Sequence, residues 1–177
     1  YTSLLLCTLL SAPAFTQLVI NEVDYDEVGT DAAEFIELKN TGTEAVPMAF
    51  VAVVMVNGSS GSGVVYHTYS SDAWPMLAPG AYFTLCGDAT AGCDDILSPA
   101  SNAIQNGPMD AIVLLDIPDS TVIDQLSYEG TLTGFAEGNG FPYGDDNDNE
   151  GRSIGRFPDG VDTNDTAADF IRMCVTL

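Results

Sequence analysis

The sequence predicts an all-β fold, an antiparallel β-sandwich of about nine short strands. Short apolar and β-branched runs recur every ~8–15 residues, and the 17 glycines and 9 prolines lie between them as turn residues. No long segment has the 3.6-residue period of an amphipathic helix, so parallel βαβ units are not expected. With 177 residues and 46% apolar content, the chain can bury one domain core.

Residues 1–17 read YTSLLLCTLLSAPAFTQ and are similar to the end of a secretory signal peptide. The apolar run Leu4–Leu10 is too short to span a bilayer, and Ala12–Ala14 suits cleavage before Phe15. Two alternatives stay open, a cleaved signal or a retained segment that adds a strand or contacts a subunit. Both predict a secreted protein, extracellular or at the cell surface, with residues 18–177 as the β-sandwich domain and no membrane span.

The stretch Leu18–Asn40, LVINEVDYDEVGTDAAEFIELKN, predicts a strand, an acidic loop and a second strand. The runs Leu18–Val23 and Glu34–Asn40 are rich in apolar and β-branched residues, which favour strands. In the second run, one face holds Ile36 and Leu38, and the other holds Phe35, Glu37 and Lys39. This period of two is typical of a strand with one face in the core, and Ile20 is expected to join that core.

Two later runs, Met48–Asn57 and Ala111–Ile117, are apolar on both faces. A strand with one face in water would alternate with polar residues, so both faces of these strands should be covered. The cover for the second faces has three candidates: residues 1–17, the glycine-rich excursion Gly130–Gly144, or a neighbouring subunit by strand addition.

Five further runs complete the predicted strands: Val64–Tyr69, Ala81–Cys86, Thr121–Tyr128, Arg152–Phe157 and Phe170–Val175. Trp74, in a loop between two of these runs, is expected to plug one end of the core. The number and spacing of the strands favour a sandwich of the immunoglobulin type.

The charge balance excludes some partners. Four basic residues oppose 26 carboxylates, which gives a net charge of −22. Binding of nucleic acid depends on clustered Lys and Arg, so the chain should not bind nucleic acid by itself, and an anionic membrane surface is disfavoured for the same reason. Repulsion among the carboxylates would be relieved by salt or divalent cations, although solubility alone also explains an acidic surface.

The four cysteines are consistent with export. Cys86 and Cys93 are spaced to close a small loop, and a disulfide between them would stabilise the fold by about 2–3 kcal/mol. Cys174 is then left either free or paired with Cys7, and the second pairing requires that the N-terminal segment is retained.

Acidic loops are the candidate metal sites, with Ca²⁺ as the candidate ion. In GDDNDNEG the carboxylates Asp146, Asp148 and Glu150 alternate before Gly151, as in the first half of an EF-hand loop. The pattern is partial, because the twelfth position holds Phe157 instead of a bidentate Glu. Two further sets are Asp24, Asp26 and Asp31, and Asp159, Asp162 and Asp165. For each set, a solvated acidic loop is the simpler interpretation.

Catalysis is not expected. The single histidine, His67, lies in a predicted strand, where a solvent-facing position is the simpler interpretation. No cysteine has a histidine and a carboxylate placed to activate it.

Three stretches, INEVDYDEVGTDAAEFIELKN, DQLSYEG and GRSIGRFPDGVDTNDTAADF, together resemble the lamin-tail domain of secreted bacterial proteins. The resemblance runs from about Leu18 to the C-terminus. It implies an immunoglobulin-like sandwich that serves as an interaction or structural module. We therefore expect a secreted, non-enzymatic structural or adhesive module that contacts other protein subunits or its own copies in an extracellular assembly. The alternative is an accessory targeting domain of a larger secreted nuclease or hydrolase whose catalytic part lies elsewhere.

Overall fold

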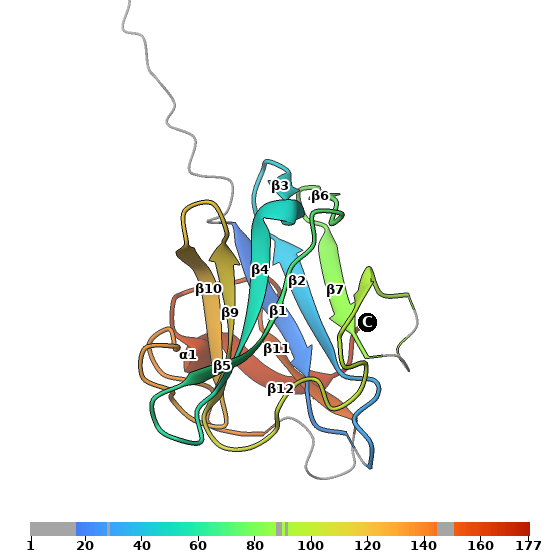
Figure 1. Cartoon of the computed structure of the whole chain (residues 1–177). Helices are drawn as coiled ribbons and strands as arrows, with labels where there is room; N and C mark the ends of the chain where they lie inside the picture. Colours follow the sequence, from blue (N-terminus) through green and yellow to red (C-terminus); the bar gives the residue numbers. More distant parts are fainter. Residues whose placement is uncertain (1–16, 28, 88–89, 91, 145–150) are drawn as a thin grey trace, which may run out of the picture.

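Two β-sheets lie face to face in the computed structural model, which describes residues 17–27, 29–87, 90, 92–144 and 151–177 (Figure 1). The six-stranded sheet has the order β12-β11-β1-β2-β7-β8 and consists of β1 (Leu18–Asp24), β2 (Phe35–Asn40), β7 (Tyr82–Cys86), β8 (Asp95–Ile96), β11 (Arg152–Arg156) and β12 (Phe170–Cys174). The four-stranded sheet has the order β10-β9-β4-β5 and consists of β4 (Val51–Asn57), β5 (Val64–Tyr69), β9 (Asp110–Asp116) and β10 (Thr121–Tyr128).

Shorter elements complete the described part of the chain. β3 (Val46–Pro47) pairs with β6 (Met76–Leu77), and a single helical turn, α1 (Thr166–Asp169), precedes β12. The short β8 pairs in parallel with β7, whereas the other paired strands are antiparallel. No helix among the described residues is long and apolar enough to cross a membrane.

The predicted all-β sandwich is confirmed, with small changes at strand ends. The predicted strand Met48–Asn57 begins only at Val51, because Met48–Phe50 forms a 3-10 turn in which the Met48 N–H donates to the Pro75 carbonyl. The two-residue strands β3, β6 and β8 were not predicted, because two residues are too few to show a period of two.

The main core lies between the sheets. Ile20, Ile36 and Leu38 are fully buried in it, as the alternation of the first two strands predicts. Trp74 packs against Phe83 with ring centroids 5.1 Å apart, in agreement with its expected position at the edge of the core.

A second apolar cluster lies on the outer face of the four-stranded sheet. Val56 of β4 and Ala111 and Val113 of β9 pack there with Leu132 and Phe135. Leu132 and Phe135 belong to the glycine-rich excursion, so the chain itself covers part of the second faces of β4 and β9. The excursion is therefore confirmed as a cover for this part of the two faces, whereas residues 1–16 lie outside the described residues.

Candidate functional site

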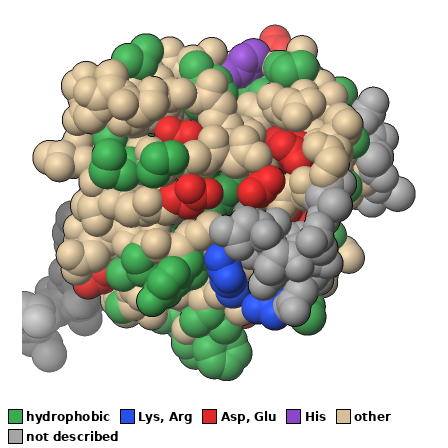
Figure 2. Space-filling view, turned by 90° about the horizontal axis from the view of Figure 1, so that it is seen from below, with side chains coloured by type: hydrophobic (Ala, Val, Ile, Leu, Met, Phe, Trp, Pro, Cys, Tyr) green, Lys and Arg blue, Asp and Glu red, His purple; other side chains and the backbone are tan. Residues whose placement is uncertain are grey.

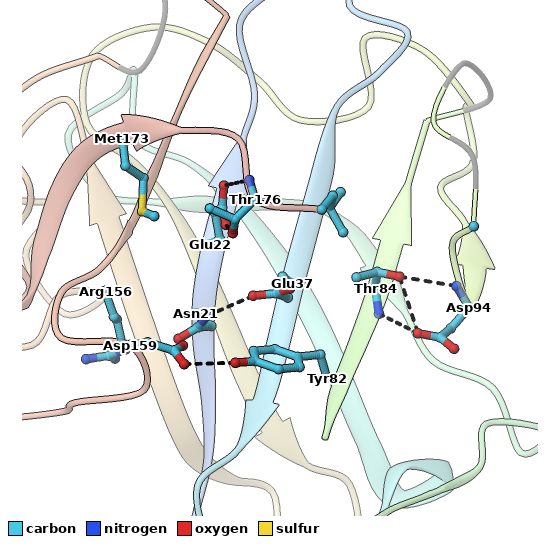
Figure 3. Close-up of a pocket in the computed structure, with 12 residues that line it drawn as sticks. Asn21, Glu22, Glu37, Tyr82, Thr84, Asp94, Arg156, Asp159, Met173 and Thr176 are labelled. Carbon is cyan, nitrogen blue, oxygen red and sulfur yellow. Dashed lines mark hydrogen bonds between the residues drawn. The ribbon is translucent and has the colours of Figure 1, made fainter. Parts of the chain in front are cut away.

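The outer face of the six-stranded sheet carries a groove of about 560 Å³ (Figure 3). Side chains of β1, β2 and β7 form its floor. Arg156 of β11, Met173 of β12 and the segments that follow β7, β11 and β12 form its walls. Four of the lining side chains are carboxylates, from Glu22, Glu37, Asp94 and Asp159. The groove therefore gathers several carboxylates on one concave surface.

Strand alternation places polar side chains on this floor. Glu37 points outward between the buried Ile36 and Leu38 of β2. On β1, a bulge interrupts the register between Ile20 and Glu22, and Asn21 and Glu22 both line the groove as a result. A bulge of this kind re-aims side chains next to a site without ending the strand.

Glu37 is the central carboxylate of the groove floor. The residue is 6% exposed, and its Oε1 accepts a hydrogen bond of 2.7 Å from Asn21 Nδ2. Burial raises the pKa of Glu37, and the charges of Glu22 and Asp159 raise it further. The hydrogen bond from Asn21 and the charge of Lys39 oppose these effects. The groove therefore presents a carboxylate whose charge has only partial compensation.

The C-terminal segment forms one side of the groove through Glu22. Ser153 Oγ and Thr176 Oγ1 donate to the Glu22 carboxylate, and the Thr176 N–H donates to Glu22 Oε1 at 3.1 Å. Glu22 is buried by these contacts, so its charge serves to fix the segment after β12 against β1.

Asp159 lies at the other side of the groove, in the loop after β11. It accepts hydrogen bonds from Lys39 Nζ and from Tyr82 Oη, the latter at 2.8 Å. Burial alone would raise the pKa of Asp159, but the hydrogen bonds from Lys39 and Tyr82 lower it below its ordinary value. Lys39 thus neutralises the charge of Asp159.

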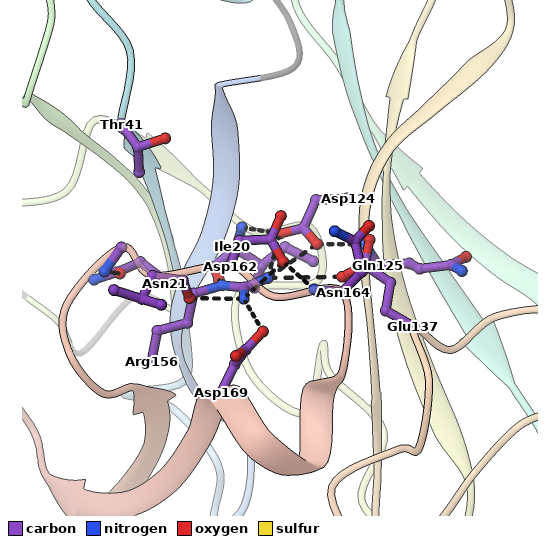
Figure 4. Close-up of polar contacts among 12 residues, drawn as sticks. Ile20, Asn21, Thr41, Asp124, Gln125, Glu137, Arg156, Asp162, Asn164 and Asp169 are labelled. Atoms are coloured by element: carbon purple, nitrogen blue, oxygen red, sulfur yellow. Dashed lines mark hydrogen bonds and ion pairs between the residues drawn. The ribbon is translucent and has the colours of Figure 1, made fainter.

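A buried ionic cluster surrounds Arg156, whose side chain also lines the groove (Figure 4). Arg156 Nη2 donates to both carboxylate oxygens of Asp124 at 3.0 Å, and Nη1 donates to Asp169 Oδ2 at 3.0 Å. Its Nε donates to the Ile20 carbonyl at 2.8 Å. Asp124 Oδ2 also accepts the Ile20 N–H at 2.6 Å, so the cluster joins β10 to β1 and β11 of the opposite sheet.

Glu137 is a further carboxyl group of this cluster. Its Oε2 is buried, has no hydrogen-bond partner in the described part of the chain and lies 4.0 Å from Arg156 Nη2. Burial and the charges of Asp124 and Asp162 raise the pKa of Glu137 to about 8. At neutral pH a proton on Glu137 therefore limits the negative charge of the cluster.

Within the described residues, three acidic side chains lie close enough together to hold a metal ion. They are Asp124, Glu137 and Asp162, whose carboxylate oxygens lie within 4.8 Å of one another. Arg156 already contacts Asp124 and Asp162. The chain therefore supplies its own cation at the place where acidic side chains converge.

The predicted opening-loop set is arranged differently. Asp31 Oδ1 accepts the Glu27 N–H at 2.9 Å, and Asp26 Oδ1 accepts from Asn106 Nδ2 at 2.9 Å. Asp24 is buried at the end of β1, and the three carboxylates do not form a group with oxygens within 4.8 Å of one another. Acidic side chains are nevertheless prominent at this end of the molecule (Figure 2).

The other two predicted sets have separate outcomes. Asp146, Asp148 and Glu150 lie outside the described residues. Asp159, Asp162 and Asp165 do not converge, because they contact Lys39, Arg156 and Asn139, respectively. Calcium binding stays a prediction.

The cysteines follow the predicted pairing. Cys86 and Cys93 form a disulfide, whereas Cys174 has an exposed free thiol. Cys7 lies outside the described residues.

Sequence reasoning missed the groove and the cluster as sites. The alternation of β2 indicated that Glu37 faces away from the core, but no local pattern joined it to Asn21 or to Asp159. Asp124, Glu137 and Arg156 are likewise far apart in the sequence. Asp159 of the groove and Asp162 of the cluster are candidate residues of the sequence analysis, but there they belong to one metal-ligand set with Asp165.

Comparison with known families agrees with this architecture. A family model described as the lamin tail domain matches residues 11–130, more than half of the chain and the whole span from β1 to β10. The strands β11 and β12 follow the matched residues and extend the same sheet from β1. A search of curated proteins finds no match. The chain belongs to the lamin tail domain family, whose members are non-catalytic immunoglobulin-like domains of protein interaction.

Proposed function

We propose that this protein works outside the cell as a non-enzymatic structural or adhesive domain that binds other protein subunits. Membership of a family of protein-interaction domains carries the proposal. The Cys86–Cys93 disulfide supports an extracellular location, because disulfides persist in oxidising compartments and are rare in the cytosol. The secretory character of the N-terminal sequence supports the same location.

Assembly with further copies of the chain is one form of this proposal. The faces of β4 and β9 are covered in part by the chain's own excursion, so they give little reason for assembly. The edge strand β5 offers a better contact, because Val64 and Val65 are 57% and 53% exposed there. An exposed edge strand with apolar side chains favours strand addition by a second chain.

Two measurements test the proposal. Light scattering at native salt, with and without Ca²⁺, should give a mass above that of the monomer if copies of the chain assemble. Immobilised folded domain should retain specific surface or secreted proteins that an unrelated immunoglobulin-like domain of similar acidity does not retain. The proposal would be contradicted if the mass is monomeric and the immobilised domain retains no specific surface or secreted protein.

Calcium is proposed as a ligand of the acidic loops. The loop with Asp146, Asp148 and Glu150 would supply oxygen donors, and the carboxylates of Asp24, Asp26 and Asp31 would have to move together to share an ion. Binding there would reduce the repulsion that accompanies a net charge of −22.

A further inference from the structure

We propose that the groove on the outer face of the six-stranded sheet binds basic side chains from an extended segment of a partner protein. The inference rests on the proposed function and names the chemistry of the partner. Four observations carry it: the charges that line the groove, the position of Glu37, the spacing of the carboxylates and the apolar wall.

The charges of the groove are only partly compensated. Lys39 neutralises Asp159, and the buried guanidinium of Arg156, which also lines the groove, is engaged by Asp124 and Asp169. The carboxylates of Glu22, Glu37 and Asp94 line the groove and form no ion pair with another described residue. Glu22 and Asp94 each receive more than one hydrogen bond from neutral groups, whereas Glu37 receives one, from Asn21.

Glu37 presents one unused oxygen to the groove. Asn21 bonds Oε1, and no described residue donates a hydrogen bond to Oε2. Because the residue is 94% buried by its neighbours, Oε2 can be reached only from the groove that it lines. A cationic N–H donor in that position would satisfy the oxygen, and it would reverse the rise in the pKa of Glu37 that burial causes.

The spacing of the carboxylates favours an extended cation over a metal ion. A calcium ion needs oxygens at 2.3–2.6 Å, which requires ligand atoms within about 5 Å of one another. No three acidic side chains of the groove come that close among the described residues. Figure 3 shows Glu22 and Glu37 over β1 and β2, with Asp94 displaced toward the edge beyond β7. Basic side chains along a peptide would contact such separated charges in turn.

The walls suit the aliphatic stems of basic side chains. Met173, Leu177 and the ring of Tyr82 line the groove beside the carboxylates. Lys and Arg bury their methylene groups against apolar surface while the charged end contacts an acceptor. Lys39 already lies in this manner over the Tyr82 ring, 4.8 Å from its centroid.

The test uses the full chain at 150 mM salt and a tri-arginine peptide blocked at both ends. The dissociation constant is measured for the wild type, for Glu37→Gln and for Asp119→Asn. Asp119 is exposed in the turn between β9 and β10 of the other sheet, so its substitution removes one charge away from the groove. We expect Glu37→Gln to weaken binding about tenfold or more and Asp119→Asn to change it by less than about twofold.

Two controls separate specific binding from general attraction to an acidic protein. A tri-citrulline peptide keeps the shape of tri-arginine without its charge, and it should not bind. Amide chemical shifts of the wild type should change at Asn21, Glu37 and Thr84 and not on the four-stranded sheet, a result that does not depend on how well any variant folds. Equal weakening by both substitutions, or shift changes spread over both sheets, would overturn the inference. If Glu37→Gln still captures the same partner proteins as the wild type, the groove is not their site, whereas the proposed interaction function stands.

Discussion

Replacement of Arg156 by methionine tests whether the buried ionic cluster joins the two sheets. The substitution keeps a long side chain against Phe170, whose ring centroid lies 4.9 Å from the guanidinium carbon. It removes the paired hydrogen bonds to Asp124 and the hydrogen bond to Asp169, and both carboxylates remain buried. Loss of one partner of a buried ion pair costs about 3–5 kcal/mol, because the other charge stays without compensation.

The expected loss is large for a domain of this size. Domains are stable by about 5–15 kcal/mol, and a loss of 3–5 kcal/mol should lower the melting temperature by about 6–20 °C at 2–4 °C per kcal/mol. The matched control is Lys39→Met, which breaks an ion pair whose acidic partner, Asp159, is 54% exposed in its side chain. Because exposed pairs contribute about 0–1 kcal/mol, this control should lose little.

Denaturant unfolding and thermal melts of both variants at pH 7 and pH 4 complete the test. Burial raises the pKa of Asp124, and the charge of Arg156 opposes this rise in the wild type. Without Arg156 the folded protein binds a proton on Asp124 more tightly, so the loss of stability should shrink as the pH falls toward 4. Equal losses for Arg156→Met and Lys39→Met at pH 7 would refute the assignment of the cluster as the principal polar link between the sheets.

Three further predictions concern pH, the disulfide and calcium. The pKa of Glu137 is raised to about 8, so the stability that its protonated carboxyl contributes is present below pH 4.5 and is lost as the pH rises through about 8. Glu137→Gln should therefore raise the melting temperature at pH 8 relative to wild type but not at pH 4. A gain of the same size at both pH values would contradict this reasoning. Replacement of both Cys86 and Cys93 by alanine should lower the free energy of unfolding by about 2–3 kcal/mol under non-reducing conditions, and unfolding that matches the oxidised wild type would show that the bridge contributes nothing. Millimolar Ca²⁺ should raise the melting temperature, and EDTA should reverse the effect. Asp146→Asn or Asp26→Asn should reduce the rise, according to which of the two loops binds the ion. No change in melting temperature with either reagent would exclude a stabilising calcium site.

The alternation of residues along the strands was readable without a structure. Ile36 and Leu38 face the core because successive side chains of a strand point to opposite faces, and the same rule places Glu37 outside. The disulfide between Cys86 and Cys93 was predictable for a similar reason, since a short loop holds both ends close together. These features depend on neighbours in the sequence.

The site depended on contacts between distant segments. Glu37 becomes buried only because the loop with Asp159 and the segment with Thr176 fold over the outer face of the sheet. The packing of Leu132 and Phe135 on β4 and β9 is likewise a contact between distant segments, which no local pattern predicts.

By itself, the sequence determined an all-β sandwich and its lamin tail family membership, because strand periodicity and the opening motif are local properties of the chain. Tertiary structure alone decided where the charges meet. Arg156 finds Asp124 across 32 positions of sequence, and the Ile20 carbonyl across 136, only after the two sheets pack. With few basic residues among many carboxylates, sequence patterns cannot say which acid each base will contact, and the packing of the sheets makes that choice.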